Sequence, residues 1–459
     1  MPLHERIAPE RVDERLALRP EYAVDAALTD VPRFHLAPDS LPPNVAYQLI
    51  HDELMLDGNA RLNLATFVTT WMEPEAARLL AECSDKNMID KDEYPVTAEL
   101  ESRCVNMLAD VWRAPEGAHP QGCSTLGSSE ACMLGGLALK FRWRNRGAAP
   151  DARPNLVMGA NVQVVWEKFC RYWEVEPRMA KLGPDRTHLT AEAAAELCDE
   201  NTIGVVAILG STFDGAYEPV AEIAGALDRL QSERGIDVPI HVDAASGGFV
   251  APFLDPDLEW DFRLPRVQSI NASGHKYGLV YPGVGWVLWR DTSAVPDELV
   301  FDVDYLGGNM PTYTLNFSRP GMQVVGQYFC FLRLGADGYR RVQQACRDNA
   351  RWLARQIDEL GPFELVSDGS GIPAFAFKLR ADVAGYTVYD VSERLRSFGW
   401  QVPAYRFPPD LDDLHVLRVV VRNGFGRELA ARLVDHLREV VRDLEESGGG
   451  GHPRAAFHH

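Results

Sequence analysis

Residues 239–248 read PIHVDAASGG, a short apolar strand that ends in an aspartate and runs into five tiny residues. Two further stretches, 155–159 and 202–209, have the length and composition of buried strands. Helical patterns follow them at 162–173 and 222–233. Short buried strands that alternate with helices predict an α/β domain with a mostly parallel sheet. Ligands of such sheets bind at the carboxyl ends of the strands, where the aspartate of the quoted stretch lies.

Around this core the sequence divides into four parts. We expect an N-terminal arm at 1–60, a large α/β domain at 61–345, a small α+β domain at 346–447 and a flexible tail at 448–459. The length of 459 residues agrees with two or three lobes, because one hydrophobic core rarely serves so long a chain. The ligand site predicted at the strand ends therefore belongs to the large domain.

The composition of the chain argues against several classes of partner. There are 66 acidic residues against 46 lysines and arginines, and the net charge of −20 opposes binding to nucleic acid or an anionic membrane. No apolar run approaches the ~20 residues of a membrane span, and the charged start does not resemble a signal peptide. The eight cysteines form no Cys-x-x-Cys pair and no His-Glu-x-x-His occurs, so we expect no metal site. These features predict a cytoplasmic protein.

The strongest chemical signal is residues 269–278, which read SINASGHKYG. Lys276 lies there among small and hydroxylated residues, directly after a histidine. A lysine whose ammonium is partly desolvated can form a Schiff base with a carbonyl compound. The alternative is a surface lysine in a glycine- and serine-rich turn, and this window alone does not decide between the two.

Two further motifs precede this lysine in the chain. Asp243, 33 residues earlier, follows a buried strand and either pairs with a buried cationic nitrogen or caps the next turn. Residues 127–130, GSSE, open an apolar helix and either hold a phosphate or form a helix cap with nothing bound. A phosphate cradle, a carboxylate and a lysine in this order favour a pyridoxal phosphate site.

These motifs resemble those of the pyridoxal-phosphate enzymes of fold type I, and within them the group II amino-acid decarboxylases. The similarity is greatest to glutamate decarboxylases of the bacterial and plant type, and it extends over most of the chain. The matching stretches are HDELMLDGN (51–59), LATF (64–67), RCVNM (103–107), GSSEA (127–131), VQVVWEKF (162–169), DAASGG (243–248), SGHKYG (273–278), DYLGG (304–308) and NFSRP (316–320). The resemblance implies a large domain with a mostly parallel seven-stranded sheet flanked by helices, and a small α+β C-terminal domain.

The resemblance also implies roles for individual residues. Lys276 would carry the cofactor, pyridoxal 5'-phosphate, as a Schiff base, Asp243 would pair with its pyridine nitrogen, and His275 would complete the catalytic group. The cofactor-binding residues would further include Ser128, Ser129, Gln163, Thr212, Ala245, Ser273, His275 and the partner subunit's Ser318. The substrate-binding residues would be Thr66, Phe67, Asn87, Asp90, Phe317 and Arg418, of which the arginine would anchor the α-carboxylate.

The activity that the resemblance implies is decarboxylation of L-glutamate to 4-aminobutanoate and carbon dioxide, with uptake of one proton. An ionised Asp90 would repel the second carboxylate of the substrate, which favours activity at mildly acidic pH. Two alternatives stay open: another fold type I enzyme, such as an aromatic or aspartate decarboxylase or an aminotransferase, and a non-catalytic scaffold of the same fold. The resemblance also implies a homodimer or a higher oligomer built of dimers.

Three features depart from the family pattern or extend it. Asp214 stands where we expect a residue with a hydroxyl group. The tail lacks the basic, tryptophan-containing segment with which plant relatives bind calmodulin, so we expect no calmodulin binding. The chain ends in His458 and His459. They form either a disordered terminus or, as the resemblance to bacterial relatives with a C-terminal histidine implies, a pH-gated plug that enters the active site when neutral.

Overall fold

The computed structural model describes residues 31–117, 119, 121–149, 151–183, 186–304 and 310–447. The described residues divide into two units, residues 31–63 and residues 64–447. In the first unit, helix α1 (Pro43–Leu54) begins with a proline, whose missing N–H would have no helical acceptor at this position. The expected tail, with His458 and His459, lies outside the described residues.

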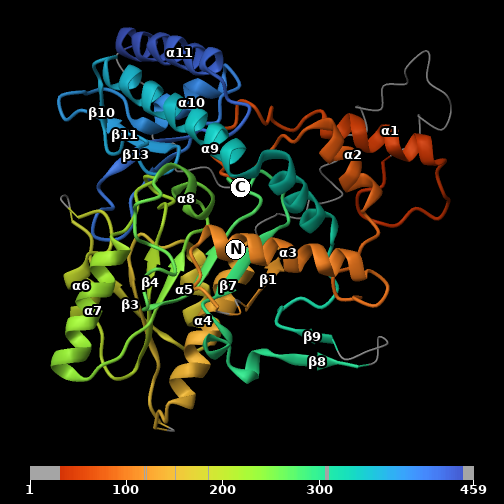
Figure 1. The fold of residues 1–459 in the computed structure, drawn as a ribbon. Coiled ribbons are helices and arrows are strands. Elements are labelled where there is room, and N and C mark those ends of the chain that lie inside the picture. The colour runs from red at the N-terminus through yellow and green to blue at the C-terminus, as the bar shows by residue number, and fades with distance from the viewer. Residues whose placement is uncertain are drawn as a thin grey trace. The chain divides into compact units, whose positions relative to one another are not determined.

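The second unit is built on a seven-stranded sheet (Figure 1). Its strands are β1 (Gln121–Thr125), β2 (Asn155–Gly159), β3 (Glu176–Ala180), β4 (Thr202–Ile208), β5 (Ile240–Asp243), β6 (Val267–Ala272) and β7 (Gly285–Trp289). They lie in the order β1-β7-β6-β5-β4-β2-β3. Strand β7 is antiparallel to both of its neighbours and the other pairs are parallel, which confirms the predicted mostly parallel sheet.

Helices cover both faces of this sheet. The helices of this part of the chain are α2 (Pro74–Glu82), α3 (Pro95–Val111), α4 (Ser128–Asn145), α5 (Val164–Tyr172), α6 (Ala191–Glu196), α7 (Val220–Arg234) and α8 (Ala251–Leu254). Successive side chains of β4 enter two hydrophobic clusters: Val205 and Ala207 pack with α3, α6 and α7, whereas Val206 and Ile208 pack with α4 and α5. Burial on both faces explains why β4 is a continuous apolar run and not an alternating one.

A second, antiparallel sheet has the strand order β10-β11-β13-β12. Its elements are β10 (Phe363–Leu365), β11 (Ala374–Leu379), α10 (Val388–Arg396), β12 (Ala404–Arg406), β13 (His415–Val420) and α11 (Arg427–Glu446). The long helix α9 (Met322–Asp358), interrupted at Gly335, contacts α2, α3 and α8 as well as this second sheet. A short ribbon of β8 (Phe301–Val303) and β9 (Met310–Thr312) precedes it. The expected division of the unit near residue 345 falls within α9 and stays a prediction.

The sequence does not predict β1, β3 or β6 as strands, because each carries several polar residues. Strand β3 is an edge strand with an exposed start, so its polar side chains reach solvent. Strand β6, by contrast, is buried over most of its length. Its polar side chains need partners inside the protein.

Three features of the described residues bear on the predicted class of protein. No described helix is long and apolar enough to cross a membrane. No group of three or more metal-ligating side chains occurs among the same residues. All eight cysteines are free thiols, and seven of them are buried.

Alanine substitutions at two helix glycines test the packing of the core. A Cβ atom at Gly136 of α4 would lie 2.6 Å from the ring of Phe169, whereas Gly225 of α7 has only the end of the Arg229 side chain at 3.8 Å. We expect Gly136→Ala to lower the free energy of unfolding by about 1–3 kcal/mol through overpacking. The control Gly225→Ala should raise it by up to ~1 kcal/mol, because alanine favours the helix. Urea denaturation measures both, and equal effects would contradict the packing.

Candidate active site

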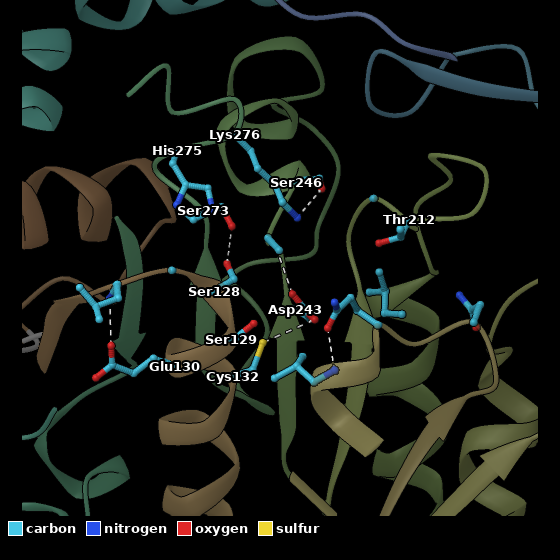
Figure 2. A pocket seen from close by; sticks show the side chains of 18 residues that line it. Ser128, Ser129, Glu130, Cys132, Thr212, Asp243, Ser246, Ser273, His275 and Lys276 are labelled. Carbon is cyan, nitrogen blue, oxygen red and sulfur yellow. Dashed lines mark hydrogen bonds between the residues drawn. The ribbon is translucent and has the colours of Figure 1, made fainter. Parts of the chain in front are cut away.

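A cavity of about 420 Å³ opens where β4, β5 and β6 end and α4 begins (Figure 2). The predicted residues that line it are Ser128, Ser129, Gln163, Thr212, Asp243, Ala245, Ser273, His275 and Lys276. The fold thus brings together every predicted cofactor-binding residue except Ser318. The cavity has the size and position that ligand sites of α/β sheets adopt.

Asp243 ends β5 and presents a buried carboxylate to this cavity. Its Oδ2 accepts a hydrogen bond from Trp166 Nε1 at 2.8 Å and faces the Cys132 thiol at 3.7 Å. Its Oδ1 accepts from Asn271 Nδ2 at 3.1 Å and from the main-chain N–H of Ala245 at 3.2 Å. No local sequence signal points to Trp166, Cys132 or Asn271 as partners of Asp243, because each comes from a different element. Donors thus hold both oxygens of this carboxylate in place, and a carboxylate suits a cationic ligand.

Lys276 reaches into the cavity from the loop after β6 (Figure 2). Its Nζ lies 3.3 Å from Ser246 Oγ and 5.5 Å from the centre of the Phe67 ring. Burial lowers the pKa of Lys276, although the nearby charge of Asp243 opposes the shift. Thr69 donates a hydrogen bond to the main-chain oxygen of Lys276 at 2.6 Å and so fixes the loop. A lysine with a lowered pKa supplies the neutral amine that a nucleophile requires.

His275 contributes a neutral ring. Its Nδ1 accepts hydrogen bonds from the N–H groups of Gly283 and Val284, each at 3.3 Å, so the ring proton belongs on Nε2. Burial lowers the pKa of His275 to about 4, and the charge of Lys276 adds to the shift. A Cβ at Gly127 would lie 2.8 Å from the His275 ring, so only glycine fits there. His275 therefore acts as a hydrogen-bond donor and not as a cation.

The phosphate cradle forms at the start of α4. Gly127 is the N-cap residue, and no side chain caps the helix, so its first N–H groups are open to an anion. Ser128 and Ser129 begin the helix, and Ser128 Oγ lies 2.7 Å from Ser273 Oγ (Figure 2). The alternative of a serine N-cap at this motif is wrong, because glycine occupies that position.

Glu130 has a role that the sequence analysis does not predict. Its Oε2 accepts a hydrogen bond from the N–H of Leu126 at 2.9 Å, within the cradle. Its Oε1 accepts from the N–H groups of Leu315 and Asn316, at 3.0 and 3.3 Å. This buried carboxylate therefore ties the cradle to the segment that continues into residues 317–318.

Arg418, on β13 of the second sheet, approaches the same region. Its guanidinium donates hydrogen bonds to the main-chain oxygens of Thr212 and Ala65. It also lies over the rings of Phe67 and Tyr405, with distances of 4.8 and 5.6 Å to the ring centres. Its Nε is buried and has no hydrogen-bond partner among the described residues. Arg418 itself does not line the Lys276 cavity.

Comparison with known proteins agrees with this geometry. The family described as pyridoxal-dependent decarboxylase conserved domain matches residues 38–380. The chain belongs to this family. It is 55% identical to the glutamate decarboxylase of Aliivibrio fischeri, over 96% of this chain and 95% of that one. It is 54% identical to glutamate decarboxylase 5 of Arabidopsis thaliana, over 90% and 85%. The solved structure of a Lactobacillus brevis glutamate decarboxylase has a TM-score of 0.90 at 47% identity, covering 93% of this chain and 98% of that one.

The cavity of this decarboxylase fits pyridoxal phosphate, the cofactor of its family. The cofactor carries a phosphate, a ring nitrogen and an aldehyde. The open start of α4 and three serine hydroxyls match the phosphate. The hydrogen-bonded Asp243 matches the ring nitrogen, and the amine of Lys276 matches the aldehyde. Gln163 and Ala245 also line the cavity, as expected for residues that sandwich the ring.

Seven predicted residues do not line this cavity: Thr66, Phe67, Asn87, Asp90, Phe317, Ser318 and Arg418. Asn87 lies 3.4 Å from Ser318 through Nδ2 and Oγ, in a group outside the Lys276 cavity. Thr66, Asp90 and Phe317 are likewise absent from its lining, and Phe317 is 43% exposed. The roles of these residues stay predictions. Phe67 and Arg418 lie near Lys276 in the same chain. Because the other five do not line the cavity of their own chain, their roles would require a second chain.

The unexpected Asp214 lies in the turn after β4. Its Oδ1 accepts a hydrogen bond from the N–H of Ala216 at 3.1 Å, an Asx-turn that stabilises the loop. Its Oδ2 lies 3.5 Å from the hydroxyl of Thr187. Asp214 does not line the cavity, although Thr212 of the same loop does. The departure therefore affects the loop and not the cavity wall.

Replacing Glu130 tests the link between the cradle and the 315–316 segment. In Glu130→Gln an amide nitrogen must face an N–H donor, which leaves buried polar groups unpaired. We expect the free energy of unfolding to fall by about 1–3 kcal/mol. The control Glu196→Gln changes an exposed glutamate at the end of α6 and should have an effect within ~0.5 kcal/mol. Equal urea midpoints for the two variants would contradict the link.

The lowered pKa of His275 predicts a pH dependence of stability. Between about pH 4 and 6.5 the unfolded chain binds a proton at this residue that the folded chain does not, so folding is disfavoured as the pH falls. We expect His275→Gln to lose this contribution, on the order of 2 kcal/mol between pH 7 and pH 4.5. Urea denaturation of the cofactor-free protein at both pH values measures it. Parallel losses of stability in wild type and variant would refute a buried neutral His275.

Proposed function

We propose that this protein is a glutamate decarboxylase, which converts L-glutamate and one proton into 4-aminobutanoate and carbon dioxide. The observation that carries the proposal is the single cavity that holds Lys276, Asp243 and the α4 cradle together. The named glutamate decarboxylases among its relatives support the choice of substrate. A scaffold would need none of these three groups.

The chain's own residues have separate tasks in this reaction. Bound pyridoxal phosphate supplies an electron sink for the negative charge left at Cα when carbon dioxide departs. Lys276 holds the cofactor through its neutral Nζ, and Asp243 keeps the ring nitrogen protonated by pairing with it. His275 Nε2–H and the hydroxyls of Ser128 and Ser129 bind the phosphate and fix the plane of the ring. The protein thereby orients the Cα–carboxylate bond and chooses which bond breaks.

Substrate recognition needs two anchors, because glutamate carries two carboxylates. We assign the α-carboxylate to Arg418, whose guanidinium is already held by main-chain oxygens and two aromatic rings. This guanidinium and Lys276 Nζ lie 4.8 and 5.5 Å from the centre of the same Phe67 ring, which puts the arginine near the reacting amine. The side-chain carboxylate is assigned to Thr66, Asn87 and Asp90.

An assay of the purified, cofactor-loaded protein tests the function. We expect carbon dioxide and 4-aminobutanoate from L-glutamate in equal amounts, with no keto-acid co-substrate. Lys276→Ala should abolish turnover, a loss of about 10³-fold or more, because no other amine lines the cavity formed by the described residues. Near wild-type release of carbon dioxide by this variant would refute the assignment. Preference for an aromatic amino acid or aspartate, or a requirement for a keto acid, would assign another reaction of the fold.

We further propose that the active unit is at least a homodimer and that it works in the cytoplasm. Ser318 and Asn87 lie outside the Lys276 cavity of their own chain, which suits a contribution to the cavity of a partner. The exposed apolar side chains of Leu315 and Phe317 beside them would be buried by a second copy. Eight free thiols agree with a reducing compartment.

Mixed dimers test whether Asp90 serves the partner's site. Chains with Lys276→Ala are co-expressed with chains carrying Asp90→Ala, each under its own affinity tag. If the two residues act across the subunit boundary, one of the two sites in each mixed dimer has both groups intact. The randomly mixed population should then have about a quarter of wild-type activity, although each variant alone is inactive. No recovery of activity would place both residues in one chain's site.

A further inference from the structure

A chain of buried hydrogen bonds leads from Asp243 away from the cavity. Asn271 Nδ2 lies 3.1 Å from Asp243 Oδ1, and Asn271 Oδ1 lies 2.7 Å from His241 Nε2. His241 Nδ1 lies 2.7 Å from Ser269 Oγ, which ends the chain. All four side chains are buried, with exposures of 5% or less. Only Asp243 lines the cavity, so the other three act through it or only stabilise the fold.

The donor and the acceptor of each hydrogen bond in this network follow from its first member, Asp243. A charged carboxylate only accepts hydrogen bonds, so Asn271 must turn its NH₂ group toward Asp243. Its carbonyl oxygen then faces His241, which must donate from Nε2–H. The other ring nitrogen is left as an acceptor, and the Ser269 hydroxyl donates to it. In this tautomer His241 pairs with the Asn271 oxygen and so holds the amide in the orientation that the carboxylate requires.

The surroundings hold His241 in this neutral form. A Cβ at Gly135 would lie 2.4 Å from the His241 ring, so α4 approaches it closely, and Trp166 packs edge-on at 5.1 Å between ring centres. Burial lowers the pKa of His241, although the charge of Asp243 opposes the shift. Trp166 also donates to the second oxygen of Asp243. The ring has no room to turn, and its two nitrogens keep their separate partners.

We propose that His241 is a positioning residue: it holds the Asn271 amide in place, and thereby keeps the donor that aims Asp243 at the ring nitrogen of pyridoxal phosphate. The proposal rests on the proposed function, in which Asp243 pairs with that nitrogen. Without a donor at position 241, the buried Asn271 oxygen has no partner, and the amide is no longer held in place against Asp243. Asp243 then loses one of its four donors, and the charged pair with the ring is weakened.

The binding of two cofactors distinguishes a positioning role of His241 from a purely structural one. We compare the binding of pyridoxal phosphate with that of its analogue in which the ring nitrogen is replaced by C–H. Both carry the aldehyde and the phosphate, so both use Lys276 and the cradle, but only the first engages Asp243. The measured quantity is the ratio of the two dissociation constants, obtained by titrating the full chain after removal of its cofactor. A general loss of structure weakens both and leaves the ratio unchanged.

We expect His241→Leu to weaken binding of pyridoxal phosphate about ten- to hundredfold and to leave binding of the analogue within about threefold. His241→Gln should restore the wild-type ratio, because its amide can donate to Asn271 and accept from Ser269. The control Val206→Ala truncates the buried neighbour of His241 on β4 and should lower stability without changing the ratio. If His241→Leu does not fold, Asn271→Ala removes the same donor and should change the ratio equally.

The outcomes distinguish the pairing of Asp243 with the ring nitrogen from the positioning role of His241. An unchanged ratio in Asp243→Asn would overturn the pairing of this residue with the ring nitrogen, and with it part of the proposed function. A changed ratio in Asp243→Asn with an unchanged ratio in both His241→Leu and Asn271→Ala would overturn the positioning role alone. Equal ratios for His241→Leu and His241→Gln would also overturn it, since a donor at this position would then not matter.

Discussion

The buried negative charge of Asp243 is the constraint on which the architecture of the site depends. A carboxylate taken out of water costs several kcal/mol unless donors replace its hydration. The fold supplies them from separate places: Trp166 from α5, Asn271 from β6, Cys132 from α4 and the main chain of Ala245 after β5. Satisfying this one group therefore requires the sheet and the helices on one of its faces to meet in a single arrangement.

That requirement explains a strand that breaks the usual pattern of a parallel sheet. Central strands of this kind are expected to be apolar throughout, yet β6 places Ser269 and Asn271 in the interior. Both side chains bond to His241 of the neighbouring β5, and the space for its ring exists because Gly135 lacks a side chain. The polar residues of β6 thus belong to the electrostatic support of the site.

The candidate site has two separate parts, and the fold links them. The cavity with Lys276 comes from one chain, whereas Asn87 and Ser318 form a separate group in that same chain. Glu130 joins the two, since its carboxylate binds the cradle on one side and the segment before Phe317 on the other. In a dimer of the proposed kind, this link connects the phosphate end of one site to the segment that serves the other.

The sequence by itself determined the elements and chemical groups whose cause is local. The buried strand 155–159 follows from its own apolar residues, and the groups that mark the site lie in short motifs around Gly127, Asp243 and Lys276. The partners of these groups lie far along the chain: Trp166 is 77 residues from Asp243, and Glu130 is 185 residues from Leu315. Only the tertiary structure decided these pairs, because a hydrogen bond depends on distance and direction in space, which local periodicity does not encode.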